Sequence, residues 1–310
     1  MMIGGIDIVV LIATLMVAST PILLAATGEL VAEKSGVLNL GVEGMMIMGA
    51  ICGFIAAVHT DSPALGFLAA AAGGIAMSLI FALLTQLLLS NQVATGLALT
   101  LFGLGLSSLV GQGYNGVKPP PSPDVNLGPL EQIPVIGDIL FRHDWMVYVS
   151  LGLVAATWAV LRYTRAGLIL RAVGENHDAA HALGYRVRLV RTLALAYGGA
   201  CAGLGGAYIS LVRVPQWSDG MTAGSGWIAL AIVVFASWRP WRVLLGAYIF
   251  GGVTVLQLRL QAAGIAIPVQ LLSMAPYLVT ILVLVIMSAR RGRAAMGAPA
   301  SLGRIFHASS

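Results

Sequence analysis

The chain has 310 residues, of which 58% are hydrophobic and only 9% are charged. Because about a quarter of the residues in a soluble domain are charged, this composition excludes an ordinary soluble globular protein. The net charge of +5 rests on few residues, so we interpret it as a topology signal and expect no nucleic-acid partner. We expect an all-α, polytopic transmembrane helical bundle that forms a single domain over residues 1–310 within the lipid bilayer.

Long apolar segments recur along the whole chain. A helix needs about 20 apolar residues to cross a membrane. The sequence predicts about nine membrane segments, at 6–26, 44–59, 64–89, 93–111, 145–161, 192–212, 227–238, 243–260 and 270–289. The segment 227–238 is short and fits a half-helix as well as a tilted span. Glycine pairs at 73–74, 198–199, 205–206 and 251–252 predict close approach of helix backbones, as is common in lipid.

A polar insert, residues 28–44, follows the first apolar segment. It carries Glu29, Glu33, Lys34, Asn39 and Glu43 among several glycines, which argue against one regular helix. One interpretation is a solvated cytoplasmic loop. The other is a broken segment that dips into the membrane and lines a pathway. Irregular backbone at depth needs cover by protein or a water-filled cavity, and ionisable groups there tend to mark a route.

A second polar patch, Ser90-Asn91-Gln92, precedes the segment 93–111. Asn91 and Gln92 fit the start of a helix, where a side-chain oxygen caps free backbone N–H groups. Their amides could equally hydrogen-bond a polar solute. Composition leaves both interpretations open.

Arginines are concentrated in three segments that predict the topology. The loop 162–191 holds six arginines, the turn 238–242 holds two, and the tail after residue 289 holds four. Because basic residues concentrate in cytoplasmic loops, we expect all three segments and the C-terminus to be cytoplasmic. The predicted helices alternate consistently with this arrangement. The loop 112–143 then lies outside, and nine crossings place the N-terminus outside.

The basic loop contains a predicted short amphipathic helix. Residues 178–183 favour a helix, Asn176 is a candidate N-cap, and Gly184 is a candidate C-terminal stop. This helix either belongs incidentally to a topology-setting loop or docks a cytoplasmic partner. His177 and His181 are four residues apart but lack a third ligand, so we predict no metal site. The chain has no Walker motif and no activated nucleophile, so we expect a subunit that is not an enzyme.

Four stretches together carry a family resemblance. Residues 28–49 resemble the signature of ABC-importer permeases of the simple-sugar and nucleoside branch, which are related to branched-chain amino-acid permeases. Three further stretches agree with this resemblance, at residues 91–99, 174–176 and 226–231. The chain most resembles the smaller permease of purine-nucleoside systems that work with basic-membrane-protein-type binding lipoproteins.

The resemblance implies partners and a location. The chain would form half of a pore with a second, paralogous permease, two ABC ATPase subunits and an extracytoplasmic substrate-binding protein. It would lie in a bacterial cytoplasmic (inner) membrane as a multi-pass protein. ATP and magnesium would belong to the ATPase, and this chain would carry no cofactor of its own.

The resemblance also implies a coupling site within the loop 162–191. Related permeases carry a Glu-Ala-Ala-x-x-x-Gly coupling loop that transmits motion of the ATPase. Asp178-Ala179-Ala180-x-x-x-Gly184 resembles a variant of this motif. Glu175 and Asn176 precede it. Aspartate replaces the family's glutamate, and His177 stands where proline is expected, so the detailed contacts stay open.

For the solute pathway we predict Asn39, Glu43, Asn91 and Gln92, because carboxylates and amides suit the hydroxyls and base edges of a nucleoside. The nearest alternative is the same machine carrying a simple sugar or a branched-chain amino acid. An ion-coupled secondary transporter is a different class, in which Glu29, Glu33 and Glu43 would be coupling groups. A structural scaffold in the membrane is a further alternative class.

Overall fold

The protein is an almost entirely helical bundle. The computed structural model describes residues 2–3, 6–123, 137–262 and 297–307, with isolated positions at 125, 128, 133, 274, 278, 281, 282 and 285. The helices are α1 (Ile8–Lys34), α2 (Val42–Thr60), α3 (Pro63–Ala82), α4 (Gln92–Gly111), α5 (Trp145–Tyr163), α6 (Arg165–Glu175), α7 (His177–Ala182), α8 (Val187–Tyr208), α9 (Ser225–Phe235) and α10 (Pro240–Ala262). Short π or 3-10 turns are η1 (Leu83–Leu87), η2 (Gln112–Tyr114), η4 (Gly137–Phe141) and η5 (Ile209–Arg213). A small antiparallel pair, β1 (Met2–Ile3) and β2 (Ile6–Asp7), precedes α1.

Seven helices within the described residues are long and apolar enough to cross a membrane. They are α1, α2, α3 with η1, α4, α5, α8 with η5, and α10, whereas α9 is shorter. Eight of the predicted segments fall on these helices, and only isolated positions of the ninth, 270–289, are described. The prediction of a polytopic helical bundle is confirmed.

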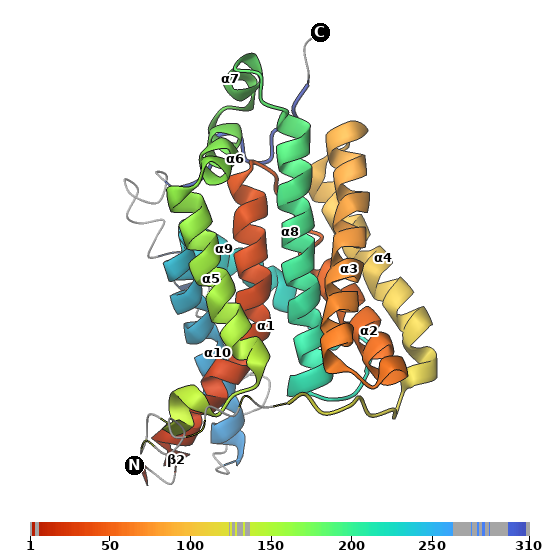
Figure 1. Ribbon diagram of the computed structural model, residues 1–310, viewed down its shortest axis with the longest axis vertical. Helices are drawn as coiled ribbons and strands as arrows, with labels where there is room; N and C mark the ends of the chain where they lie inside the picture. The colour runs from red at the N-terminus through yellow and green to blue at the C-terminus, as the bar shows by residue number, and fades with distance from the viewer. Residues whose placement is uncertain are drawn as a thin grey trace.

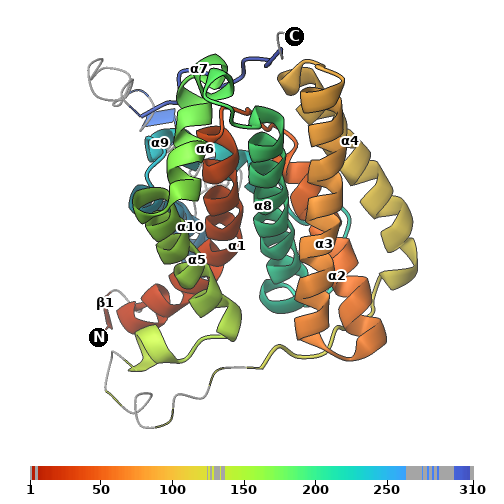
Figure 2. The same cartoon turned by 45° about the horizontal axis from the view of Figure 1, so that its top comes forward.

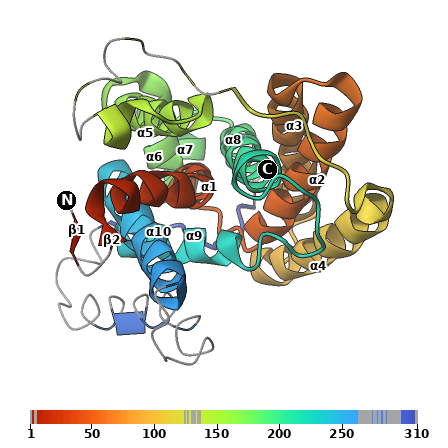
Figure 3. The ribbon, with the colours of Figure 1, turned by 90° about the horizontal axis from the view of Figure 1, so that it is seen from below.

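Helix α8 lies at the centre of the bundle, between α1 and the pair α2 and α3 (Figure 3). The contacts are close because small residues face one another. A Cβ on Gly28 of α1 would lie 2.6 Å from Cys201 Cβ, and a Cβ on Gly199 would lie 2.6 Å from Ser78 Cβ. The close approach predicted from the glycine pairs is therefore confirmed on α8. Helix α4 packs outside α2, while α5, α9 and α10 pack on the other side of α1.

Side-chain caps fix where several helices begin. The Asn91 side chain accepts a hydrogen bond from Ala94 N at 3.0 Å at the start of α4, and Thr164 Oγ1 accepts one from Gly167 N at 3.1 Å at the start of α6. Asp144 caps α5 by accepting from Met146 N at 3.0 Å, and its other oxygen accepts from the Tyr208 hydroxyl at 2.6 Å. Burial raises the pKa of the Asp144 carboxyl above its usual value. Asp144 thereby joins the start of α5 to the end of α8.

The basic segments lie together at one end of the bundle. Helices α6 and α7 lie at this end and β2 near the opposite end (Figure 1), and the tail 297–307 runs close to α7 (Figure 2). The Lys34 ammonium donates to Gly297 O at 3.0 Å, and Arg162, Arg171, Arg239 and Arg242 line one cavity with Lys34. The prediction that the loop 162–191 and the turn 238–242 share a side is confirmed. Arg290, Arg291 and Arg293 lie outside the described residues.

Candidate functional site

The polar insert is a break between α1 and α2. Helix α1 continues past the predicted boundary at residue 26 to Lys34, so Glu29 and Glu33 lie on its last two turns. Both glutamates are buried, at 1% and 0% exposed. The irregular part is only residues 35–41, where Gly36 takes a φ of +89° and reverses the chain. The boundary at 26 was wrong because the charged residues looked like loop residues.

The break enters the bundle. A Cβ on Gly44, in the first turn of α2, would lie 2.7 Å from Leu99 O, in the second turn of α4. Thr100 Oγ1 donates to Leu40 O at 3.1 Å. Most of residues 35–41 are buried by other parts of the chain. The insert is therefore not an exposed loop, because other parts of the chain cover its irregular backbone. A pathway role and its depth in the membrane stay predictions.

Asn39 and Gln92 hold this break in place. Asn39 Nδ2 donates to Glu29 Oε2 at 3.1 Å, and Asn39 Oδ1 accepts from Gly41 N at 3.0 Å. Gln92 Oε1 accepts from Leu38 N at 2.8 Å. One amide thus ties the break to α1, and the other ties it to α4.

Glu43 joins the break to α9. Its Oε1 accepts from Thr222 Oγ1 at 2.5 Å and from Gly224 N at 2.9 Å, and its Oε2 accepts from Gly226 N at 2.6 Å. These amides belong to the first turn of α9, and Glu43 itself lies in the first turn of α2. A carboxylate at a helix N-terminus pairs with free N–H groups and with the positive end of the helix dipole. The two helix starts therefore meet at one buried charge.

The four predicted pathway residues divide into two groups. Asn39, Glu43 and Gln92 are buried and bonded across the break, whereas Asn91 is exposed and caps α4. The capping interpretation is thus confirmed for Asn91. Glu29 Oε1, Glu33 Oε1 and Gln92 Nε2 are buried and have no hydrogen-bond partner among the described residues. The Trp238 indole donates to Glu33 Oε2. The sequence carried no signal that pointed to Thr222 or Trp238 as partners.

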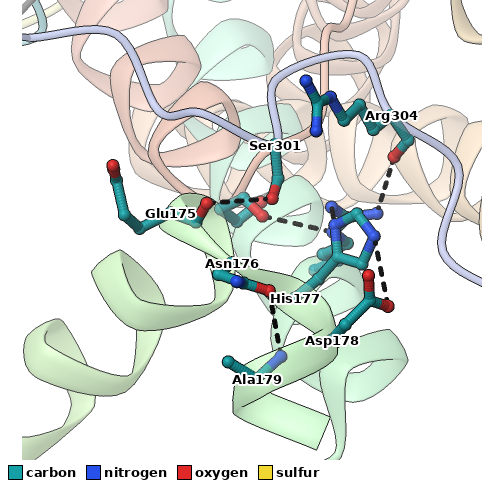
Figure 4. Close-up of polar contacts among 9 residues, drawn as sticks. Glu175, Asn176, His177, Asp178, Ala179, Ser301 and Arg304 are labelled. Atoms are coloured by element: carbon teal, nitrogen blue, oxygen red, sulfur yellow. Dashed lines mark hydrogen bonds and ion pairs between the residues drawn. The ribbon is translucent and has the colours of Figure 1, made fainter.

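The basic loop folds as two helices, α6 and α7, with the predicted caps on α7 (Figure 4). Asn176 Oδ1 accepts from Ala179 N at 2.9 Å. Gly184 N donates to His181 O at 2.8 Å, and Tyr185 N donates to Ala180 O at 3.1 Å, the two bonds of a Schellman motif. Gly184 has a φ of +88°, which glycine adopts without strain. Asn176 as N-cap and Gly184 as the stop signal are confirmed.

Helix α7 has one fixed face and one exposed face. Ala180 and His177 are buried, at 2% and 7% exposed. Leu183 is 77% exposed, the side chain of Asp178 is 76% exposed, and Ala179 is also exposed. Glu175 is an exposed residue at the end of α6. An apolar side chain such as Leu183, presented at the end of the bundle, suits contact with another protein.

The tail holds the inner face of this helix pair. Ser301 N donates to Gly174 O at 2.9 Å, and Ser301 Oγ donates to Glu175 O at 3.2 Å (Figure 4). Gly303 N donates to Gly36 O at 3.1 Å, so the tail also contacts the break. Phe306 packs edge-on against His177 and His181, with ring centroids 5.4 and 5.2 Å apart. The sequence placed the tail on the side of the basic loop but did not predict these contacts.

Arg191 connects the same parts from within. It is fully buried; its Nε donates to Ser35 O at 3.2 Å, its Nη1 to Arg304 O at 3.1 Å, and its Nη2 to His177 Nδ1 at 3.3 Å. Arginine only donates, so Nδ1 of a neutral imidazole must accept. Burial and this guanidinium lower the pKa of His177. His177 is therefore engaged in packing, and the described residues contain no group of three or more His, Cys, Asp or Glu that could hold a metal ion.

The apolar spans and the covered break between α1 and α2 define a multi-pass membrane protein, with the exposed face of α7 at one end. Residues 11–288 match the family described as the branched-chain amino acid transport system / permease component, and the chain belongs to this family. It is a permease subunit of an ABC importer. The family implies an ATPase and a substrate-binding protein as partners, and its permeases are non-catalytic transport components. ATP-driven import is thus favoured over the ion-coupled transporter that Glu29 and Glu33 had left open.

Three relatives show which permeases of this family the chain is similar to. The chain is 42% identical to a putative glucose ABC transporter permease of Haloferax volcanii, over 86% of this chain and 88% of the relative. It is 31% identical to a guanosine ABC transporter permease of Bacillus subtilis and 32% identical to a nucleoside ABC transporter permease of Lactococcus lactis. Each of these two alignments covers 89% of this chain and 91% of the relative. No solved structure matches the chain.

Proposed function

We propose that this chain forms half of the pore of an ATP-driven importer and that α7 is its coupling helix. The chain pairs with a second, paralogous permease. Each α7, with Asp178, Ala179 and Leu183 outward, docks in an ATPase subunit. The end that carries α7 and the tail is cytoplasmic, which agrees with the arginine bias. A C-terminal fluorescent-protein fusion that folds in the cytoplasm supports this orientation, and activity of an alkaline-phosphatase fusion there contradicts it.

The single observation that carries this proposal is the two-faced character of α7. Its inner face is anchored by Ala180 and the tail, whereas Leu183 is 77% exposed. A helix that transmits force must be fixed to its own subunit and free to contact the partner. The six residues of α7, between the Asn176 cap and Gly184, meet both requirements.

The contacts also provide a continuous route from α7 to the middle of the bundle. Gly174 lies against the break so closely that a Cβ there would meet the Lys34 backbone. Arg191 joins His177 to Ser35 at the start of the break. Glu43, just after the break, holds the start of α9. We propose that ATPase closure moves α6 and α7, that the break follows, and that α9 moves with it.

In this scheme the four pathway residues have different roles. Asn39, Glu43 and Gln92 position the break and α9 beside the solute route. Asn91 is exposed at the start of α4, where its amide can meet a solute. A weak permeation site is expected, because the binding protein supplies most of the affinity.

The test of coupling uses Leu183→Glu, which adds a charge to the exposed face without disturbing a buried contact. His307→Glu, at an exposed tail residue outside α7, is the matched control. We expect Leu183→Glu to lower co-purification of the ATPase and ATP-dependent uptake at least tenfold, while His307→Glu behaves as the wild type. Unchanged assembly and uptake in Leu183→Glu would show that α7 is not the docking helix.

For the solute we propose a nucleoside, supported by the two nucleoside permeases among the relatives. The second candidate is a simple sugar, favoured by the 42% identity to a putative glucose permease. Both present ring hydroxyls to amide and carboxylate groups. Uptake by proteoliposomes containing the whole complex, measured for guanosine, adenosine, glucose and leucine, separates them. Uptake of leucine alone contradicts both candidates, and uptake that needs an ion gradient but not ATP contradicts the importer.

A further inference from the structure

A basic cavity lies at the α7 end of the bundle, apart from the coupling contacts and the break. Its volume is about 770 Å³, and its walls come from α1, α5, α6, the turn before α10 and the start of α10. Five cationic side chains line it: Lys34, Arg162, Arg171, Arg239 and Arg242. None of the described residues that line it is an aspartate or glutamate. Such a concentration of positive charge favours an anionic ligand.

Aromatic side chains border the same cavity. The Trp158 ring lies 5.9 Å from Trp241 and 5.3 Å from Tyr163, measured between centroids. All three line the cavity, and Tyr163 and Trp241 are 71% and 46% exposed. Trp158 and Tyr163 lie in the last turns of a membrane span, α5, and Trp241 lies in the first turn of another, α10. Tryptophan and tyrosine concentrate at the level of lipid headgroups, so the cavity lies at the membrane surface.

An apolar cavity adjoins the basic one. It has a volume of about 290 Å³ and shares Leu161 of α5 with the basic cavity. Its other walls include Leu153, Val160 and Leu170. A basic, aromatic-bordered cavity beside an apolar one matches an amphiphile with an anionic head and a hydrocarbon chain. A free phosphate would use only the first of these features.

We propose that the basic cavity binds the phosphate-bearing headgroup of an anionic phospholipid. Arginine forks donate paired hydrogen bonds to phosphate oxygens, and lysine adds a point charge. Basic pockets between transmembrane helices at the cytoplasmic surface are suited to such headgroups. The lipid bridges α5, α6 and α10, and it contacts Arg171 on the helix that leads into α7. The site is independent of which solute the importer carries.

The experiment compares lipid retention in the purified importer complex. The complex is exchanged into detergent with either phosphatidylglycerol or phosphatidylcholine, and bound lipid is counted by native mass spectrometry. The test variant is Arg239→Gln with Arg242→Gln. The control is Arg259→Gln, which removes one arginine charge near the opposite end of α10, and each single variant, Arg239→Gln and Arg242→Gln, is compared with it. Inorganic phosphate is added as a competitor in a separate arm.

We expect wild type and Arg259→Gln to retain phosphatidylglycerol in preference to phosphatidylcholine. Each neutralised arginine in the cavity should weaken this retention about fivefold. If the double variant retains as much phosphatidylglycerol as the wild type, the proposal is overturned. Displacement of the lipid by millimolar phosphate would show a free-phosphate site instead. Loss of the ATPase with unchanged lipid retention would show that the cavity docks an acidic segment of that partner.

Discussion

The carboxylate of Glu43, in the first turn of α2, accepts a 2.6 Å hydrogen bond from the backbone N–H of Gly226, 183 residues further along the chain. The approach is so close that a Cβ on Gly226 would lie 2.6 Å from Glu43 Cα. Both α2 and α9 begin at this contact. The carboxylate at the start of α2 therefore holds the N-terminus of α9, and the break after α1 and the short helix α9 form one unit.

Replacing Glu43 with glutamine tests this unit. The amide keeps the size of the side chain but removes the charge, and its NH₂ group would face a donor at Gly226 or Gly224. We expect Glu43→Gln to destabilise the native state by about 1.5–3 kcal/mol, as is typical when a charged hydrogen-bond acceptor is lost. A lower thermal unfolding midpoint of the purified complex would register it. Glu175→Gln, which alters an exposed carboxylate, should leave the midpoint unchanged.

Gly226→Ala tests the close approach of the backbones. The added methyl group would meet the Glu43 backbone, which cannot move aside as a side chain does. We expect about 1–3 kcal/mol of destabilisation from overpacking and a loss of ATP-dependent uptake. Gly105→Ala on α4 is the control, because a Cβ there has nothing within 4 Å. A Gly226→Ala protein as stable as Gly105→Ala would argue against the tight contact.

Arg191→Lys tests whether the positions of the tail and of α7 depend on a guanidinium. A lysine ammonium cannot reach Ser35 O, Arg304 O and His177 Nδ1 in the fork geometry that arginine provides. Each buried acceptor left unpaired costs about 1–3 kcal/mol. Hydrogen exchange of α7 and of residues 301–306 should therefore accelerate at least tenfold. The exposed Arg186→Lys should show wild-type exchange, and identical exchange in both variants would count against this role.

The pKa of His177 predicts how pH affects the same region. Arg191 and Arg304 face the imidazole and oppose its protonation together with burial, and only Asp178 favours it. Because the folded-state pKa is lowered, the unfolded chain takes up the proton first, and the native state loses stability as pH falls below about 6.5. Above that value His177 is neutral in both states and contributes no pH dependence.

We therefore expect proteolysis of the tail to increase as the pH is lowered from 7 to 5.5. His177→Gln removes the titrating group and should reduce this dependence. A wild-type digestion rate that does not change over this range would refute the link. His181→Gln is the control, because its ring contacts Phe306 but does not accept from Arg191.

Much of the fold could be predicted because its signals are local. Apolar length located eight of the nine segments on observed helices, and the caps of α7 followed from Asn176 and Gly184. The end of α1 was missed because Glu29 and Glu33 looked like loop residues. They remain helical and buried because Asn39 and Trp238 supply hydrogen bonds from elsewhere in the bundle.

The candidate site was predicted less completely. Asn39, Glu43 and Gln92 were recognised as polar groups in unusual positions, and the structure brings them to one break. Their partners were not predictable, because nothing in the local sequence links Thr222 or Gly226 to a residue about 180 positions earlier. The contacts of the tail around Ser301 and Phe306 were not predicted for the same reason.

The sequence by itself determined that this is a polytopic membrane protein, where most of its spans lie and which loop carries the short capped helix α7. These properties depend on apolar length, arginine placement and caps, all of which act within a few residues. Only the tertiary structure decided which groups donate hydrogen bonds to Glu43, how the tail fixes α7, and that five cations from four parts of the chain surround one cavity. A buried polar group needs a partner, but the partner is chosen by helix packing, which joins residues more than a hundred positions apart.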